Sequence, residues 1–189
     1  MRPFAPWIVA VVCVSLLAVV AGASGRSRPE ARIEALEVAV ENRRLMVSFH
    51  LVDAFGDDLR RRVDSGLPTE LSYELELNRD RKRWFDKDLE TSRLQAIAMF
   101  NAVTSEYLIN FKQDGRLIES RMVRDRDDLI EAMTHFDGLP AFDLDGRDAE
   151  SRYLLRVRAR LGVRNAFGWI PRSLATDWIE SRKFRVGDG

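Results

Sequence analysis

The sequence predicts a mainly β domain, an antiparallel β-sandwich or open barrel of about seven to nine strands with two short helices. Three observations lead to this fold class. Apolar and polar residues alternate in several segments, turn signals separate those segments, and the strands do not alternate with long helices as in a parallel sheet. The hydrophobic fraction of 46% is ordinary for a globular protein, so the chain can bury a core.

Two elements open the domain. Residues 33–55 alternate in hydrophobicity on both sides of the polar stretch 41–44, which predicts a β-hairpin. Residues 56–68 interrupt this alternation and predict a short helix, because acidic residues begin the segment and Gly66 suits its end.

Three further strands and a turn are expected next. Residues 67–78 alternate most regularly, so one face of this strand should pack on the core. Residues 94–103 are assigned to a strand because hairpin patterns surround them, although their alanine and methionine content also suits a helix. Residues 107–123 predict a second hairpin that turns at Asp114-Gly115.

A second helix is expected over residues 124–140, where acidic residues begin the segment and Gly138 and Pro140 end it. Four apolar residues form a stripe at helical spacing: Leu129, Ile130, Met133 and Phe136. Residues 141–151 then predict a loop. Its acidic residues suit a turn better than a calcium site, because they lack the spacing of an EF-hand loop.

The C-terminal part returns to strands. Residues 152–163 alternate, with apolar side chains facing inward and arginines facing outward. Residues 167–186 predict one or two strands around Pro171.

The N-terminus, residues 1–23, predicts a signal peptide. Arg2 supplies a positive charge, residues 7–22 carry none, and small residues precede Ser24. An uncleaved inner-membrane anchor is the alternative, although the apolar run is shorter than the roughly 20 residues of a spanning helix. Either way we expect a periplasmic or otherwise extracytoplasmic protein, with a flexible lead over 24–30 and a single β-rich domain over 31–187.

Cys13 is the only cysteine, and it lies inside the apolar run rather than at its end, so lipidation is not expected. The exported chain would contain no cysteine. A disulfide framework, a thiolate metal site and a cysteine nucleophile are therefore not expected.

The composition argues against several kinds of site. With 30 basic and 30 acidic residues, the chain has no net charge that would attract nucleic acid. The two histidines, His50 and His135, have no neighbouring cysteine and no H-E-x-x-H pattern, so we expect structural roles rather than a metal site. No phosphate-binding glycine loop or dinucleotide motif occurs, so no cofactor is expected and no catalytic residue is assigned.

Arg83, Trp84 and Phe85 are the first candidates for partner binding. They lie in a charged connection that follows the strand over 67–78. Adjacent residues of an extended chain point to opposite faces, so one aromatic ring should enter the core while the other lies among charges.

Arg156 and Arg158 are the second candidates, on the outward basic stripe of the strand over 152–163. We favour pairing of this stripe with Glu74 or Glu76 across the sheet over a surface that binds an anionic ligand.

Several short motifs follow one another in a fixed order along the chain: Gly66-Leu67-Pro68, Arg83-Trp84-Phe85-Asp86, the stretch from Phe100 to Tyr107, Leu129-Ile130-Glu131-Ala132, the stretch from Tyr153 to Leu161, and Pro171 with Trp178 and Ser181. In these motifs the chain resembles a bacterial family of exported proteins, the domain-of-unknown-function family 4390. The resemblance covers nearly all of the expected mature chain. Relatives often have a Tyr-His pair where Phe100-Asn101 stand here.

The resemblance implies a bacterial, extracytoplasmic protein and carries over no catalytic residues. Relatives are often encoded near a membrane sensor kinase, which suggests a part in envelope signalling. We therefore expect a non-catalytic module that binds an envelope or membrane protein such as a sensor kinase, without nucleic acid, and with membrane contact only through an uncleaved N-terminal segment.

Two alternatives stay open. One is a carrier of an apolar or lipid ligand, with Leu129, Met133 and Phe136 lining its cavity. The other, with less support, is a hydrolase whose site is not recognised from the sequence.

Overall fold

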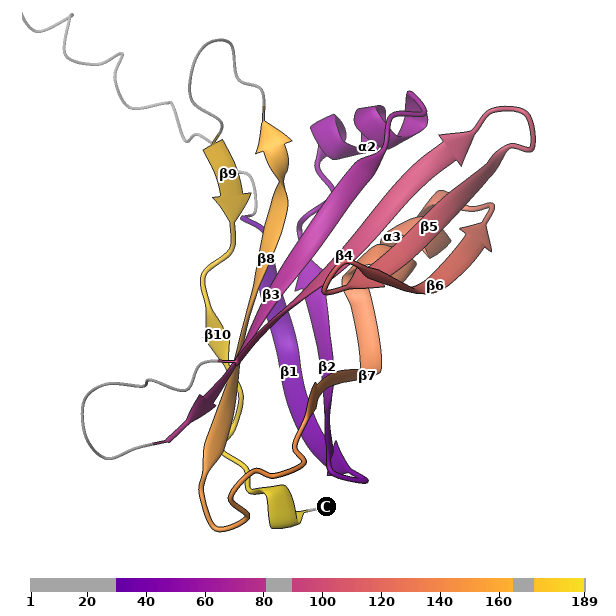
Figure 1. The fold of residues 1–189 in the computed structure, drawn as a ribbon. Coiled ribbons are helices and arrows are strands. Elements are labelled where there is room, and N and C mark those ends of the chain that lie inside the picture. The colour runs from indigo at the N-terminus through magenta and orange to yellow at the C-terminus, as the bar shows by residue number, and fades with distance from the viewer. Residues whose placement is uncertain (1–29, 81–89, 165–171, 189) are drawn as a thin grey trace, which may run out of the picture.

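A computed structural model describes residues 30–80, 90–164 and 172–188, and its description leaves out the side chains at 58, 162–164 and 172–174. Two antiparallel sheets face each other, one of three strands and one of seven (Figure 1). Nine of the described strands have four residues or more, and the tenth has two. The expected fold class, a sandwich-like antiparallel β domain with two helices, is therefore confirmed.

The smaller sheet has the strand order β1-β2-β7. It is built from β1 (Arg32–Glu41), β2 (Arg44–Val52) and β7 (His135–Asp143). The first two strands form the expected hairpin. Asn42 and Arg43 connect them with φ angles of 48° and 58°, the left-handed values that a tight two-residue hairpin turn requires.

The larger sheet has the order β10-β8-β3-β4-β5-β6, and β9 pairs with β8. Its strands are β3 (Thr69–Arg79), β4 (Glu90–Asn101), β5 (Glu106–Gln113), β6 (Arg116–Val123), β8 (Tyr153–Arg164), β9 (Arg172–Ala175) and β10 (Ile179–Glu180). The expected strands over 67–78, 94–103 and 152–163 are confirmed, as is the hairpin at Asp114-Gly115. Of the one or two strands expected around Pro171, the described part shows β9 and β10, and Pro171 itself lies outside the described residues.

The core lies between the two sheets and centres on three aromatic rings. Phe49 of β2, Tyr73 of β3 and Phe136 of β7 have ring centroids 5.0 to 5.2 Å apart, within the range that favours aromatic pairs. The Tyr73 hydroxyl donates a 2.7 Å hydrogen bond to the carbonyl of Met133, so its one polar group is satisfied. Burial of this phenol raises the pKa of Tyr73.

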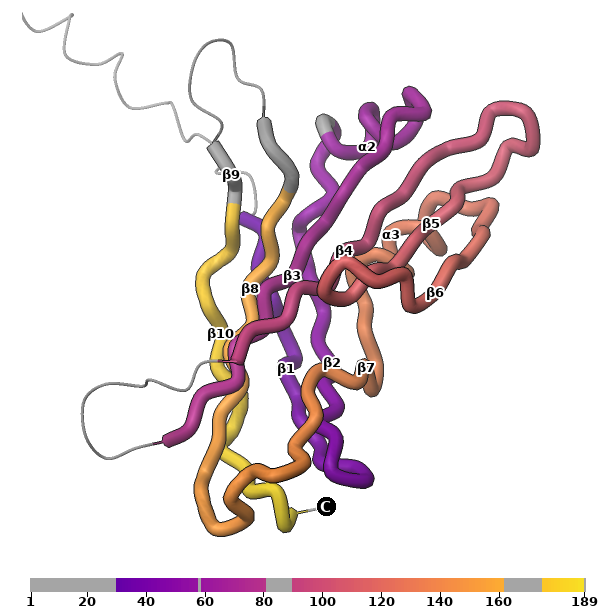
Figure 2. The backbone as a smooth tube through the Cα atoms, viewed as in Figure 1, coloured from indigo at the N-terminus to yellow at the C-terminus, as the bar shows by residue number. Residues whose placement is uncertain are grey.

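Two helices and the smaller sheet cover the large sheet. The helix α2 (Asp57–Asp64) contacts β3 and β4, and α3 (Arg126–Thr134) contacts β4, β5 and β6. β1 contacts β8, and it also contacts the terminal 3-10 turn η1 (Val186–Asp188) near the C-terminus (Figure 2). α2 confirms the first expected helix, and Gly66, with a φ of 77°, follows its end.

The expected second helix was too long. α3 ends at Thr134, and residues 135–143 form β7, so the stripe member Phe136 and the residues Gly138 and Pro140 belong to a strand. The first part of the expected loop over 141–151 also belongs to β7. Phe136 stands opposite Phe49 in the β2–β7 register, and its burial in the aromatic core outweighs the helical spacing of the sequence. Pro140 is tolerated because β7 is an edge strand of the described sheet.

Within the described ranges, no helix is long and apolar enough to cross a membrane. The signal peptide over 1–23 and most of the lead over 24–30 lie outside these ranges, so the export signal and the location of the protein stay predictions.

Candidate functional site

The arginine stripe of β8 pairs with carboxylates of β3. Arg158 approaches Glu74 to 2.5 Å, and Arg160 approaches the same carboxylate to 2.7 Å. Arg156 lies 3.6 Å from Glu76. We call these five residues the arginine ladder. The expected pairing of the stripe with Glu74 and Glu76 is confirmed, and the β3–β8 register places Glu74 opposite Arg158 and Glu76 opposite Arg156.

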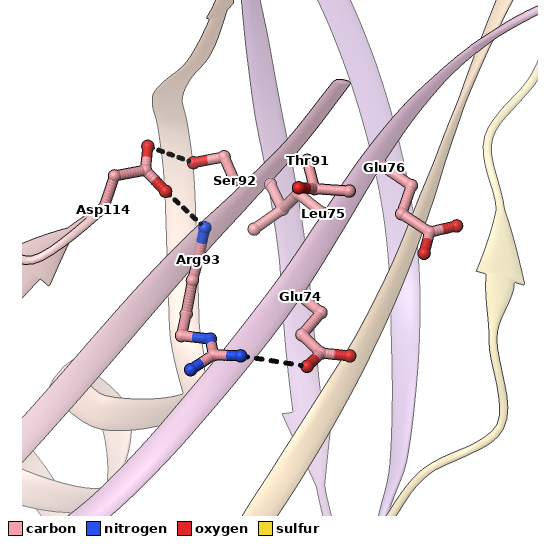
Figure 3. A pocket seen from close by; sticks show the side chains of 7 residues that line it. All are labelled: Glu74, Leu75, Glu76, Thr91, Ser92, Arg93 and Asp114. Carbon is pink, nitrogen blue, oxygen red and sulfur yellow. Dashed lines mark hydrogen bonds and ion pairs between the residues drawn. The ribbon is translucent and has the colours of Figure 1, made fainter. Parts of the chain in front are cut away.

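Glu74 is the centre of the ladder. Its side chain is only 16% exposed, and a third arginine, Arg93 of β4, lies 3.5 Å from it (Figure 3). Burial by itself would raise the pKa of Glu74. Hydrogen bonds from Arg158 and Arg160 outweigh that effect, so the pKa is held below its ordinary value. The carboxylate is therefore ionised at neutral pH and neutralises positive charge on both neighbouring strands.

Trp178 covers the ladder. The guanidinium carbons of Arg156 and Arg158 lie 4.9 and 4.4 Å from its ring centroid, a cation–π arrangement with both arginines. Arg156 also approaches Glu180 to 3.5 Å. Arg156 and Arg158 are thus engaged by groups of their own chain. Their predicted part in partner binding stays a prediction, and this arrangement does not favour an anionic ligand.

Two polar pockets lie on the large sheet. The first, about 360 Å³, is lined by Glu74, Leu75, Glu76, Thr91, Ser92, Arg93 and Asp114. Asp114 accepts hydrogen bonds from the Ser92 hydroxyl at 2.9 Å and the Arg93 amide at 2.8 Å (Figure 3). The second, about 220 Å³, contains Arg79 and Asp148, which pair at 2.5 Å. Both are open hollows with charged side chains in their lining, and neither is an enclosed apolar cavity.

The stripe proposed to line a lipid cavity instead belongs to the core. Leu129 and Met133 are 1% and 0% exposed, and Phe136 packs against Phe49 and Tyr73. This packing does not support the carrier hypothesis.

Arg83, Trp84 and Phe85 lie outside the described residues, between the end of β3 and the start of β4. Their part in partner binding stays a prediction.

An exposed apolar surface, which the sequence did not reveal, lies on β4, β5 and β6. Met99 stands opposite Leu108, and Leu108 stands opposite Met122, so the three side chains form one row across three strands. We call it the apolar row. Met99 is 41% and Met122 70% exposed. Leu117 and Ile118, farther along β6, are 59% and 48% exposed.

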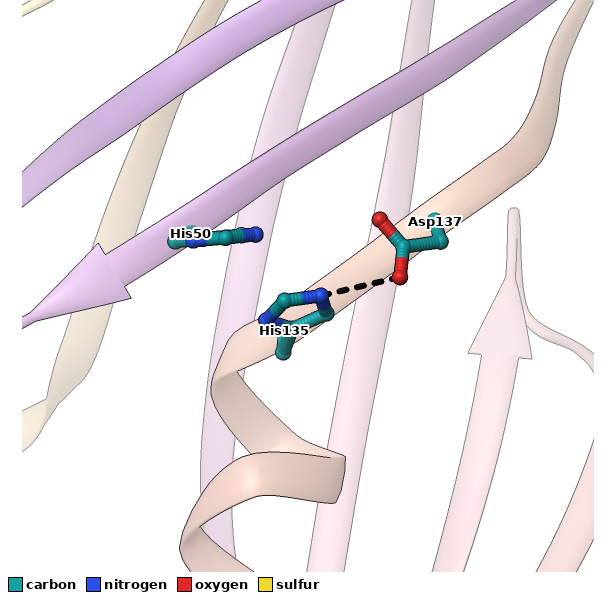
Figure 4. A group of neighbouring side chains, drawn as sticks. All are labelled: His50, His135 and Asp137. Atoms are coloured by element: carbon teal, nitrogen blue, oxygen red, sulfur yellow. Dashed lines mark hydrogen bonds and ion pairs between the residues drawn. The ribbon is translucent and has the colours of Figure 1, made fainter.

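The two histidines also come together. His50 of β2 and His135 of β7 are cross-strand partners, and their ring centroids are 3.7 Å apart. Nε2 of His135 lies 2.9 Å from a carboxylate oxygen of Asp137 (Figure 4). This cluster is not expected from the sequence, because the helical spacing over 124–140 places residue 135 near the end of a helix instead of on a strand beside β2.

Comparison with known proteins places the chain in a family. No curated protein and no solved structure matches it. A family model described as "Domain of unknown function (DUF4390)" matches residues 28–178. The matched range includes all the strands from β1 to β9 and Trp178, which covers the arginine ladder. The chain therefore belongs to the DUF4390 family, as its ordered motifs indicated.

Proposed function

We propose that this protein is a non-catalytic interaction module of the bacterial cell envelope, which holds an extended segment of an envelope protein along the edge of β6. The observation that carries the proposal is the open β6 edge beside the exposed apolar row. The signal-peptide pattern supports the location, and a membrane sensor kinase is the kind of partner that the family resemblance suggests.

β6 is the last strand of the large sheet. β5 pairs with one side of it, and no described strand lies on its other side. An edge strand presents unpaired main-chain N–H and C=O groups, which an extended peptide can satisfy by adding a strand to the sheet. All but the last residue of β6 are exposed, so such a peptide could reach the strand along most of its length.

The apolar row would give such pairing its binding energy. Met122 lies on β6 itself, and Leu108 and Met99 continue the row onto β5 and β4. Methionine side chains are flexible and adapt to different apolar partners. A segment that adds to β6 and places an apolar side chain beside Met122 would bury surface that is now in water.

Charged side chains on an edge strand often hinder pairing with another strand, but they hinder it only weakly on β6. Glu119 and Arg121 pair with each other at 2.8 Å, and the Arg121 guanidinium lies 5.5 Å from the Phe111 ring centroid. Both residues are therefore held on the strand by intrachain contacts instead of standing free against an approaching strand.

The charge of β6 favours a different chain as the partner over a second copy. β6 carries Arg116, Arg121 and Glu119, two positive charges and one negative, which leaves an excess of one positive charge. Two such edges side by side would bring together like excess charges, whereas a neutral or acidic segment would not.

Site-specific photo-cross-linking tests the proposal. A photoreactive amino acid replaces Met122 in the full chain, produced in its own bacterium, and adducts are identified by mass spectrometry. Leu67 is the matched control, because it is apolar and 55% exposed but lies before β3, with β4 and β5 between it and β6.

We expect Met122, and not Leu67, to cross-link reproducibly to one envelope protein. The Met122→Lys substitution should abolish co-purification of that protein. A cross-link only to a second copy, equal cross-linking from both positions, or no adduct at Met122 would overturn the proposal.

A further inference from the structure

We infer that His50, His135 and Asp137 form a binding site for a divalent transition metal ion of the Zn²⁺ or Cu²⁺ class, on the outer face of the smaller sheet. This site is separate from the β6 edge, and the inference does not depend on the proposed partner.

The fold holds the two histidines together by strand register. His50 and His135 stand opposite each other in the β2–β7 ladder, and Phe49 and Phe136, one residue away on each strand, face the core. A slip of either strand by one residue would turn its phenylalanine toward solvent, so the core packing fixes the histidine pair as well. Asp137 lies two residues after His135 and so points to the same face.

The three side chains offer suitable ligand atoms at short range. One nitrogen or oxygen from each residue lies within 4.8 Å of the others. Metal–ligand bonds of about 2.1 Å in tetrahedral geometry place ligand atoms roughly 3.4 Å apart, so small side-chain rotations would bring all three to one ion. His135 and Asp137 already lie closer, at 2.9 Å, and an ion would replace the hydrogen bond between them.

The local charge favours a cation. Glu34 of β1 is the cross-strand partner of His50 on its other side, and it pairs with Arg32 at 2.7 Å. Arg32 also pairs with Asp53 at 2.5 Å. Glu34, Asp53 and Asp137 supply three negative charges against the one positive charge of Arg32, so an incoming cation meets a net negative surface.

The site is also accessible. The side chains of His135 and Asp137 are 36% and 74% exposed, and His50 is half-buried. Imidazole and carboxylate together suit Zn²⁺ and Cu²⁺ rather than Ca²⁺ or Mg²⁺, which prefer all-oxygen sites. Three protein ligands leave a coordination position for water or for a side chain of a partner.

The chain has only two histidines, which makes the test unusually direct. The exported form is produced without a histidine tag, and the imidazole proton and nitrogen signals are recorded by NMR during titration with Zn²⁺. His50→Gln assigns the two sets of signals. Titration calorimetry with Zn²⁺, Cu²⁺ and Mg²⁺ measures affinity and stoichiometry.

We expect both imidazoles to shift, or to broaden with paramagnetic Cu²⁺, at one equivalent of metal, and we expect no response to Mg²⁺. Asp137→Asn and His135→Gln should each weaken binding at least about tenfold, in line with the loss of one contributor to a metal site. Asp127→Asn, at an exposed acidic position of α3, is the control and should not change the affinity.

The inference fails if Zn²⁺ and Cu²⁺ leave both imidazoles unperturbed, or if the double variant His50→Gln, His135→Gln binds metal as tightly as the parent chain. Because Asp137 is mostly exposed, its variant keeps the test valid even where a histidine variant is poorly folded.

Discussion

Two regions on the same face of the large sheet differ in how their side chains are satisfied. Over β3 and β8, the arginine ladder pairs its charges within the chain and Trp178 covers it. Over β4, β5 and β6, the apolar row leaves Met99 and Met122 in contact with water. The first region contributes to stability without a partner, whereas the second offers surface that only another molecule can bury.

This difference separates substitutions that should affect folding from those that should affect binding. Glu74 is a partly buried anion with three arginines around it, so its removal leaves cations without a counter-charge. Met122 is mostly exposed and makes few contacts within the chain, so its replacement should change the binding surface and leave the stability of the fold nearly unchanged.

Among the changes to the arginine ladder and the apolar row, Glu74→Ala should have the largest effect on stability. We expect a loss of about 2–4 kcal/mol in the free energy of unfolding, because Arg158 and Arg160 lose a partly buried carboxylate partner. Urea unfolding followed by far-UV circular dichroism measures it. Glu70→Ala is the control: Glu70 lies on the same face of β3 but is exposed, and it accepts one hydrogen bond from Gln95. Equal losses in the two variants would show that the ladder is no more stabilising than an ordinary surface contact.

Trp178→Ala should have an intermediate effect. We expect a loss of about 1–2 kcal/mol, since two cation–π contacts and the covering of the ladder are removed. Trp178→Phe keeps an aromatic face above both arginines and should retain part of this free energy. The same urea titration measures this loss. An alanine variant as stable as the parent would show that Trp178 does not stabilise the ladder.

Acid should weaken the ladder through Glu74. Its folded pKa lies below the ordinary value of 4.5, so its contribution to stability is complete above that pH and is lost as the pH falls through the lower folded pKa. The stability difference between the parent chain and Glu74→Gln should therefore be constant near neutral pH and shrink below about pH 4.5. Urea titrations at several pH values measure this difference. A difference that stays constant into the acid range would contradict the pairing of an ionised Glu74.

The sequence predicted the ladder but not the histidine cluster. The ladder follows from local alternation within two strands, whereas the cluster depends on a contact between segments that are far apart in the chain. The alternation of β3 and β8 is strong enough to show which residues face outward, and opposite charges on those faces suggest their pairing. The histidine cluster depends on β7, whose apolar residues also fit a helical stripe. Only the packing of Phe136 against Phe49 decides between the two readings, and that contact joins segments far apart in the chain.

The open edge was missed for a related reason. The β6 segment was correctly assigned to a hairpin arm, because Asp114-Gly115 marks the turn. Local sequence does not show that no described strand lies beyond β6, since strand order depends on the whole chain. The hairpin prediction therefore did not show that Leu117, Ile118 and Met122 would be exposed.

Met122→Lys should have the smallest effect on stability and thereby sharpen the contrast with the ladder. Because the side chain is 70% exposed, we expect the free energy of unfolding to change by no more than about 0.5 kcal/mol. Ile109→Lys is the opposite control on the neighbouring strand β5, where the residue is 0% exposed and a charge should prevent folding. A Met122→Lys variant as unstable as a core variant would show that Met122 packs within its own chain, and the apolar row would then belong to the fold rather than to a partner.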